Sequence, residues 1–441
     1  MERLAYHALR GEVWGKALAY FRQAGAKAAA RSAHREAVGC FEQALVALQH
    51  LPEDRDVREQ AIDLRFSLRN ALLPLGEQGQ IFDHLRAARS LAEALHDEPR
   101  LGRAYAYLAE YFRMTGDSAR AVESGERALA LATALGDFAL EVMATFFVGT
   151  AYRDLGDYRR AVDHFRRNVA ILPGELTRER FGMTGLPSVM SQTMLVSCLA
   201  DLGAFEEGTT RGEEAVRMAE AGDHPFSLTQ AYFALGSLYL RKGDLRQAIP
   251  VLERGLERCQ IANIRTWFPT VAATLGYAYT LAGRVAEALP LLQQAAAQDT
   301  SRGISAAHAR WVAYLSEAYL LTGHLEEATG LARSALALAR DRKARGNEAY
   351  ALRLLGEIHA HQDPPTVEAA EAAYQQSLAL AEELGMRPLL AHCYLGLGSL
   401  YTKVGRPAQA RVALSTAIEL FHAMEMAFWL PRAEGTLAQT E

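Results

Sequence analysis

The 441-residue sequence predicts an all-α fold made of one repeated pair of helices. A glycine recurs at a nearly constant interval along the chain, and the apolar residues on both sides of it follow helical spacing. Apolar residues make up 50% of the chain and charged residues 22%, a composition that suits a folded protein and excludes a disordered one.

The turn glycines define the period of the repeat. Most are 40 residues apart, and the step of 47 after Gly156 contains an insertion that we place at residues 173–187. The last step is 82 because residues 362–365 replace one glycine. A helix end often needs a left-handed residue, which glycine supplies without strain. The turn glycines are Gly76, Gly116, Gly156, Gly203, Gly243, Gly283, Gly323 and Gly405.

Residues at fixed distances from the turn have predicted roles. Asp117, Asp157 and Asp244 follow their glycines and are expected to cap the second helix of the pair. A small residue seven positions before the turn, such as Gly276, lets the two helices approach closely. An aromatic residue three positions later fills the adjacent space. We expect about eleven antiparallel helix pairs with a period near 40 residues.

Charge and cysteine content exclude several classes of protein. The net charge is −5, from 47 basic and 52 acidic residues, whereas a general nucleic-acid surface carries a basic excess. The four cysteines form no CxxC pair, which argues against a disulfide scaffold or a zinc motif and fits a reducing cytosol. No apolar stretch of about 18 residues occurs, and the first residues lack a signal core. We expect a cytoplasmic chain with no nucleic-acid or membrane partner.

The repeated phrase resembles the tetratricopeptide repeat (TPR). It is seen in FVGTAYRDLGDYRRAVDHFRRNVAIL at residues 147–172, and at least seven units carry the signature residues. The period exceeds the usual length of about 34 residues. The resemblance implies a TPR-like α-solenoid, a right-handed superhelix in which the first helix of each pair lines a concave groove. It also implies that the groove binds a protein or peptide.

Exposed positions on the first helices are therefore the candidate binding residues. Their arginines are suited to reading acidic side chains or a terminal carboxylate, because guanidinium groups pair bidentately with carboxylates. The alternative is that these are solvated surface charges, some of them paired with the glutamates of the same set. The candidates are Arg103, Glu110, Arg113, Arg153, Gln230, Arg241, Tyr277, Arg310, Glu317, Tyr350, Arg353, Glu357, His392 and Lys403.

The sequence contains few other features that could carry chemistry. GLGSLY at residues 396–401 lacks the strand before it and the GK[ST] after it that a phosphate loop needs. His359 and His361 are two positions apart and point to different sides of a helix, so they are a poor metal site. The insertion at 173–187 is either a functional loop or a tolerated excursion. We expect no enzyme activity, no metal and no cofactor in this chain.

Two tryptophans near the middle of the array suggest a second interpretation. Trp267 and Trp311 open helices there, and with Tyr277 they either pack the core or line a pocket for a small molecule within 267–317. A small-molecule effector-sensing solenoid that controls an attached ATPase or cyclase is accordingly the alternative function.

The opening of the chain resembles the start of the repeat arm in a group of bacterial multidomain regulators. Those proteins carry a class III adenylate or guanylate cyclase domain and an ATPase module of the signal-transduction type. The resemblance covers essentially the whole chain but only the arm of that family. It implies a sensor or docking arm whose cis partners, the ATPase and cyclase domains, lie outside this chain. It is carried by LAYHALRGE at 4–12, YFRQAGAKA at 20–28, AHREAVGCFEQAL at 33–45 and GMRPLLAHCYLGLGSLY at 385–401.

The sequence also predicts how the chain is divided. Residues 1–56 form N-terminal repeat-like pairs that continue from an upstream domain, because Met1 falls at the start of a helix with no polar cap. Residues 57–425 form the main array with its insertion, and 426–441 form a C-terminal capping helix and tail.

Overall fold

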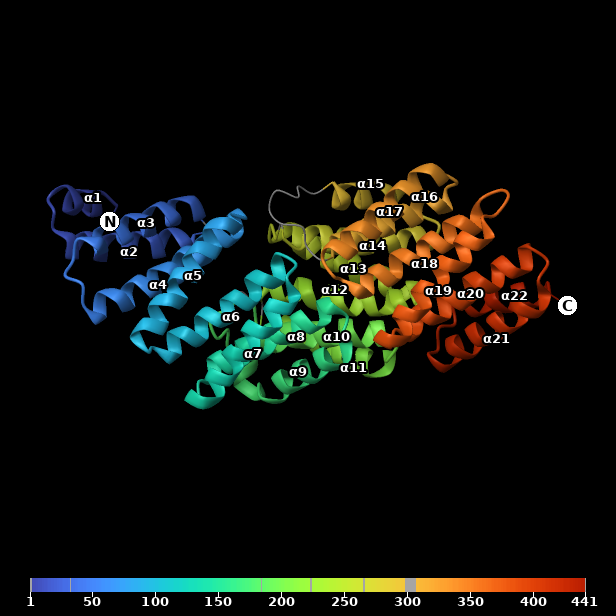
Figure 1. Ribbon diagram of the computed structural model, residues 1–441, viewed down its shortest axis with the longest axis horizontal. Coiled ribbons are helices and arrows are strands. Elements are labelled where there is room, and N and C mark those ends of the chain that lie inside the picture. Colours follow the sequence, from blue (N-terminus) through green and yellow to red (C-terminus); the bar gives the residue numbers. More distant parts are fainter. Residues whose placement is uncertain are drawn as a thin grey trace. The chain divides into compact units, whose positions relative to one another are not determined.

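The computed structural model describes residues 2–31, 33–183, 185–222, 224–264, 266–297 and 307–440. Within these ranges it contains 22 α-helices, two short 3₁₀ helices and no strand, which confirms the all-α prediction (Figure 1). The described chain forms two compact units. Unit 1 spans residues 2–148, and unit 2 spans 149–297 together with 307–440.

Unit 1 contains seven complete α-helices, one 3₁₀ helix and most of an eighth α-helix. They are α1 (Glu2–Arg10), α2 (Trp14–Ala30), α3 (His34–Gln49), α4 (Arg55–Leu72), η1 (Leu73–Leu75), α5 (Gln78–Leu95), α6 (Glu98–Met114), α7 (Ser118–Leu135) and α8 (Phe138–Leu155), which runs across the boundary.

Unit 2 contains the rest of the described helices. They are α9 (Tyr158–Ala170), η2 (Gly174–Arg178), α10 (Pro187–Leu202), α11 (Phe205–Ala221), α12 (Pro225–Lys242), α13 (Leu245–Ile261), α14 (Phe268–Leu281), α15 (Val285–Ala296), α16 (His308–Leu321), α17 (Leu325–Asp341), α18 (Arg345–His361), α19 (Val367–Leu384), α20 (Arg387–Lys403), α21 (Pro407–Ala423) and α22 (Leu430–Ala438).

The turn between the two helices of a pair has the predicted geometry. All eight turn glycines have a positive φ, between 72° and 89°. The residue after each of seven of them donates its N–H to a carbonyl five positions earlier, as in Asp244 N to Tyr239 O at 2.8 Å. Asp117, Asp157 and Asp244 accept a backbone N–H three residues on, so the predicted caps are confirmed.

A second left-handed turn ends the second helix of many pairs, and a glycine marks it only in some of them, as at Gly136 and Gly385. Here the left-handed residue is often not glycine: His96, Asn263, Lys343 and Glu425 have φ values from 50° to 53°. The same hydrogen bond closes the turn, for example from Met426 N to Phe421 O at 2.9 Å. The chain therefore reverses direction twice in each of these repeats, both times through a left-handed residue and the same backbone hydrogen bond.

The helices of a pair cross at the small residue predicted for that purpose. A Cβ built on Gly236 would lie 2.6 Å from Leu252 Cγ, and one on Gly398 would lie 2.5 Å from Leu414 Cγ. Each leucine is 16 positions after its glycine. The missing side chain thus makes room for a leucine from the partner helix, and the pair packs closely.

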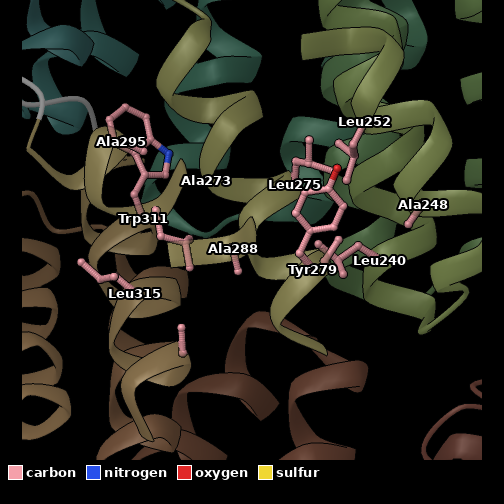
Figure 2. Packing of buried hydrophobic residues seen from close by; sticks show 13 residues of the cluster. Leu240, Ala248, Leu252, Ala273, Leu275, Tyr279, Ala288, Ala295, Trp311 and Leu315 are labelled. Carbon is pink, nitrogen blue, oxygen red and sulfur yellow. The ribbon is translucent and has the colours of Figure 1, made fainter. Parts of the chain in front are cut away.

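Neighbouring pairs share buried apolar clusters. One buried cluster of unit 2 runs from Leu252 through Leu275 and Leu292 to Trp311 and Leu315, and so joins α13 to α16 (Figure 2). A further cluster continues from α16 to α19. Each pair covers the apolar face that its neighbour leaves open, as expected for stacked repeats.

The aromatic residue before the turn lies at the edge of this core. The Tyr279 ring is buried in the cluster, yet its hydroxyl donates to Glu253 Oε1 at 2.7 Å. The Arg284 guanidinium lies 4.0 Å from the centre of the same ring. These tyrosines therefore join core packing to polar contacts at the surface.

The insertion at 173–187 packs onto its own unit. The Ser188 hydroxyl donates to Thr177 O at 2.7 Å, and Leu186 N donates to Ser227 Oγ on α12 at 3.0 Å. Met183 and Leu186 are buried. The choice between a functional loop and a tolerated excursion stays open.

The crossing geometry predicts that Gly276→Leu destabilises the protein. A Cβ there would lie 2.8 Å from Leu292 Cγ and 3.1 Å from Ala288 O, so the two helices must separate. We expect a loss of about 1–3 kcal/mol in the free energy of unfolding, measured by urea denaturation.

The matched control is Gly330→Leu on α17, where an added Cβ meets nothing within 4 Å. It is expected to be neutral or slightly stabilising, because leucine favours a helix more than glycine does. Equal midpoints for the wild type and Gly276→Leu would contradict the helix pairing.

Candidate functional site

The candidate residues of unit 1 do not form one cluster. Arg103 is exposed, whereas Glu110 forms an ion pair with buried Arg69, whose guanidinium lies 4.4 Å from the centre of the Tyr107 ring. Burial lowers the pKa of Arg69 to about 10. Arg113 is partly buried. Glu110 therefore compensates a buried charge within unit 1.

Most candidates of unit 2 converge, and the first group surrounds a carboxylate that sequence analysis missed. Asp201 Oδ1 on α10 lies 3.1 Å from Arg241 Nη2 and 3.6 Å from Arg310 Nη1. The Tyr350 hydroxyl donates to the same oxygen at 3.4 Å. The two guanidinium carbons lie 4.4 and 4.6 Å from the centre of the Tyr350 ring. We call Asp201, Arg241, Arg310 and Tyr350 the Asp201 cluster.

The second group is an alternating chain of acids and bases. Arg353 Nη2 lies 2.7 Å from Glu317 Oε2, and Arg353 also pairs with Glu357. Glu357 Oε1 lies 3.8 Å from Arg432 Nη2 on α22. We call Glu317, Arg353, Glu357 and Arg432 the Glu317 cluster.

Burial and the neighbouring charges act in opposite directions on the pKa values of the Glu317 cluster. Burial raises the pKa of Glu317 despite the adjacent Arg353. Burial would also raise the pKa of Glu357, but the charges of Arg353 and Arg432 outweigh it and lower that pKa. The two glutamates together raise the pKa of Arg353 well above its ordinary value, so this guanidinium stays charged.

Two stacked tyrosines contact the Glu317 cluster, and both act electrostatically on Arg241 of the Asp201 cluster. The Tyr277 and Tyr314 rings stack with centroids 4.1 Å apart, and the Tyr277 hydroxyl donates to Glu317 Oε1 at 3.1 Å. Burial raises the pKa of Tyr277, so its hydroxyl remains a hydrogen-bond donor. The Asp201 cluster, the Glu317 cluster, Tyr277 and Tyr314 together form what we call the inner face of unit 2.

The inner face is crowded but not sealed. The side chains of Arg241, Arg310 and Arg353 keep 15%, 20% and 12% of their surface exposed. Charged groups and stacked rings that solvent still reaches can hold planar and anionic groups by bidentate hydrogen bonds and stacking.

Four further candidates belong to neither cluster, although the charges of Arg353 and Arg241 reach His392 and that of Arg153 reaches Arg310. Arg153 pairs with its neighbour Asp154 at 2.6 Å. Gln230 is buried, and its Oε1 accepts no hydrogen bond within the part of unit 2 that the structure describes. Lys403 is exposed and donates to Ala360 O at 3.3 Å. The His392 ring lies edge-on to Trp429, with centroids 4.5 Å apart.

The C-terminal helices cover the turns of earlier repeats in unit 2. A Cβ on Gly203 would lie 2.5 Å from Met424 Sδ, and one on Gly243 would lie 2.8 Å from Phe428 Cβ. An added Cβ on Gly283, Gly323 or Gly405 would meet nothing within 4 Å. The glycines at 203 and 243 therefore have a second role, because the chain returns to pack against them.

An ion pair and a shared carboxylate reinforce this return contact. Lys242 Nζ lies 2.9 Å from Glu425 Oε2 across 183 positions of sequence. Asp201 and Tyr350, which meet in the Asp201 cluster, are 149 positions apart. Unit 2 thus brings its first and last repeats together, and that closure assembles the inner face.

Asp201 could have been found from the repeat itself. It stands two positions before Gly203, and Arg241 stands two positions before Gly243, so the two residues are equivalent in adjacent pairs. Tyr314, four positions after Arg310, follows from the helical spacing. Arg432 carried no signal, because it lies on the final helix α22, outside the repeat pattern, and reaches the site by pairing with Glu357 of α18.

Trp267 and Trp311 pack against neighbouring side chains. Trp311 is 6% exposed within the core cluster of Figure 2, and the Trp267 ring packs 5.4 Å from Phe233 and 6.3 Å from Phe226. Among the described residues no group of three histidines, cysteines or carboxylates is placed to hold a metal ion. No helix among them is long and apolar enough to cross a membrane.

Comparison with known proteins agrees with the repeat assignment. Tetratricopeptide repeat models match residues 229–260 and 347–422, so the chain contains such repeats. The sequence has no match among curated proteins.

Several solved structures are similar in fold. A Rap protein in complex with competence and sporulation factor is 16% identical with a TM-score of 0.58, covering 83% of this chain and 98% of that one. The apo form of RapI is 11% identical with a TM-score of 0.53, covering 63% and 96%. A signal transduction ATPase with a tetratricopeptide repeat sensor from Pyrococcus horikoshii is 13% identical with a TM-score of 0.47, covering 87% and 55%.

The likeness to the two Rap structures shows the fold and supports the predicted TPR-like solenoid. At these identities it does not transfer function. The more specific prediction, a repeat arm of a cyclase–ATPase regulator, stays a prediction.

The packing of the C-terminal helices against Gly243 predicts that two similar glycine substitutions destabilise the protein by different amounts. Gly243 and Gly323 have φ values of 89° and 82°, so alanine at either position pays the left-handed backbone penalty. Only Gly243→Ala also displaces Phe428. We expect Gly243→Ala to lower the free energy of unfolding by about 1–3 kcal/mol more than Gly323→Ala in urea titrations. Equal losses would contradict the closure.

His392 predicts a pH dependence of stability. Burial lowers its pKa well below the ordinary value, and the charges of Arg353, Arg241 and Arg432 lower it further. The unfolded chain therefore takes up a proton below about pH 6.5 that the folded chain refuses, so stability falls as pH falls by up to about 1.4 kcal/mol per pH unit.

We expect this dependence to be flatter in His392→Gln, measured as free energy of unfolding between pH 7.5 and about pH 5.5. The control, His422→Gln, changes a histidine whose side chain is 62% exposed and should keep the wild-type slope. A wild-type slope in His392→Gln would contradict the assignment.

Proposed function

We propose that the inner face of unit 2 binds a peptide or a segment of a protein, and that the chain acts as the sensor or docking arm of a signalling regulator. The observation that carries this proposal is the convergence of charged and aromatic side chains from α10, α12, α14, α16, α18 and α22 on one partly exposed surface. Stacked tyrosines and arginines are the residue types that most often dominate binding surfaces.

Two further observations support a binding role. A fold-similar Rap protein was solved with competence and sporulation factor, which gives a precedent for ligand binding on this fold. The described residues form no metal cluster, and the titratable groups of the inner face are engaged in ion pairs, so the geometry suits recognition. The role as a regulator's arm, with ATPase or cyclase domains in cis, rests on the resemblance of the opening and C-terminal phrases.

Site-specific photocrosslinking tests the binding surface. A benzoylphenylalanine in place of Tyr314, partly exposed on the inner face, is expected to give adducts in lysate of the source cells. The same probe in place of Val412, which is 71% exposed on α21, is the control and should give none.

The captured segment is then synthesised and its Kd measured. Tyr277→Ala should weaken binding about tenfold, because the ring on which Tyr314 stacks is lost. Adducts at both positions alike, or only at Val412, would overturn the proposed surface.

A further inference from the structure

The inner face carries one more positive charge than its fixed carboxylates compensate. The Glu317 cluster holds two arginines and two glutamates, and Arg153 has Asp154. The Asp201 cluster holds two guanidinium groups and one carboxylate.

The contacts inside the Asp201 cluster do not use all the N–H donors of its two guanidinium groups. Arg241 and Arg310 both approach Asp201 Oδ1, and Arg310 Nε donates to Asn347 Oδ1 at 2.9 Å. A guanidinium group has five N–H donors, so two of them offer more than these contacts use. The Tyr350 ring between them gives partial compensation through cation–π contacts, but it carries no charge.

Such an arrangement is costly without a further anion. Removing a guanidinium group from water costs several kcal/mol unless a counter-charge is near, and these two side chains are only 15% and 20% exposed. Burial lowers the pKa of Arg241 and of Arg310, and the charge of Asp201 does most to raise it in both. One carboxylate therefore serves two buried cations.

We propose that the Arg241–Arg310 pair binds a carboxylate group of the peptide ligand beside Asp201. This inference rests on the proposed peptide-binding function and names the chemical group that the inner face recognises. Guanidinium geometry matches a carboxylate bidentately, and the pair already holds one carboxylate in Asp201. The source is either the terminal carboxylate of a peptide or an acidic side chain.

Four small probes on the full chain test this, at ionic strength matched with sodium chloride. They are N-acetylglycylglycine with a terminal carboxylate, its amide, N-acetylaspartic acid α-amide bearing only the side-chain carboxylate, and inorganic phosphate. Apparent Kd values come from the dependence of Tm on probe concentration. We expect one or both carboxylates to raise Tm, the amide to have no effect, and the stronger carboxylate to identify the source.

The proposal predicts that two substitutions change the affinity for a carboxylate in opposite directions. Arg310→Gln should weaken carboxylate binding about tenfold. Asp201→Asn should strengthen it about tenfold, because the competing carboxylate is gone while both guanidinium groups remain. Should Asp201→Asn fail to fold, Arg241→Gln takes its place and should weaken binding as Arg310→Gln does.

Arg284→Gln is the matched control, because Arg284 pairs with Glu287 away from the inner face and should leave the Kd unchanged. The proposal is overturned if the amide shifts Tm as the carboxylates do, if phosphate alone binds, if no probe binds, or if Arg310→Gln binds like the wild type. If the photocrosslinking probe at position 314 still captures a partner, any of these results would reject only the carboxylate assignment. The proposed peptide-binding function would then stand.

Discussion

The structure depends on the close approach of two helices at a residue with a minimal side chain. At Gly236, Gly276 and Gly398 a leucine 16 positions later fills the space that a Cβ would occupy. That contact fixes how the helices of a pair cross, and it directs the apolar faces of the pair toward its neighbours. Because neighbouring pairs share a core, a change at one crossing affects the packing of the next.

The same repeat also determines where polar residues meet. Positions near the end of each first helix recur every 40 residues, so equivalent side chains such as Asp201 and Arg241 lie together in adjacent pairs. Successive first helices then bring Arg353 of α18 to Glu317 of α16 and Arg432 of α22 to Glu357 of α18. Tyr350, also on α18, reaches Asp201 of α10 from a distant repeat. The inner face therefore depends both on contacts between adjacent helix pairs and on contacts between distant repeats of unit 2.

The fold was largely predictable because its signals are local. Turn glycines and aspartate caps act within a few residues, so their spacing reveals the helices directly. The left-handed turns at His96, Asn263, Lys343 and Glu425 were missed because a non-glycine residue gives no such signal. The candidate residues were chosen by repeat position alone, which located Arg241, Arg310, Tyr350 and Arg353. The alternative that some arginines pair with glutamates of the same set is seen in Arg353, which pairs with Glu317 and Glu357. The contact of Tyr350 with Asp201 had no local signal, because it spans 149 positions of sequence.

The central claim is that the last repeats of unit 2 pack against its earlier turns and so assemble the inner face. Lys242 and Glu425 form an ion pair across that contact. Spin labels on cysteines introduced at these two positions report the distance between them by double electron–electron resonance. The four cysteines of the chain are buried, which favours selective labelling of introduced ones. A single short and narrow distance distribution is the predicted result. A long or broad distribution would show that the repeats stay open and would contradict the account.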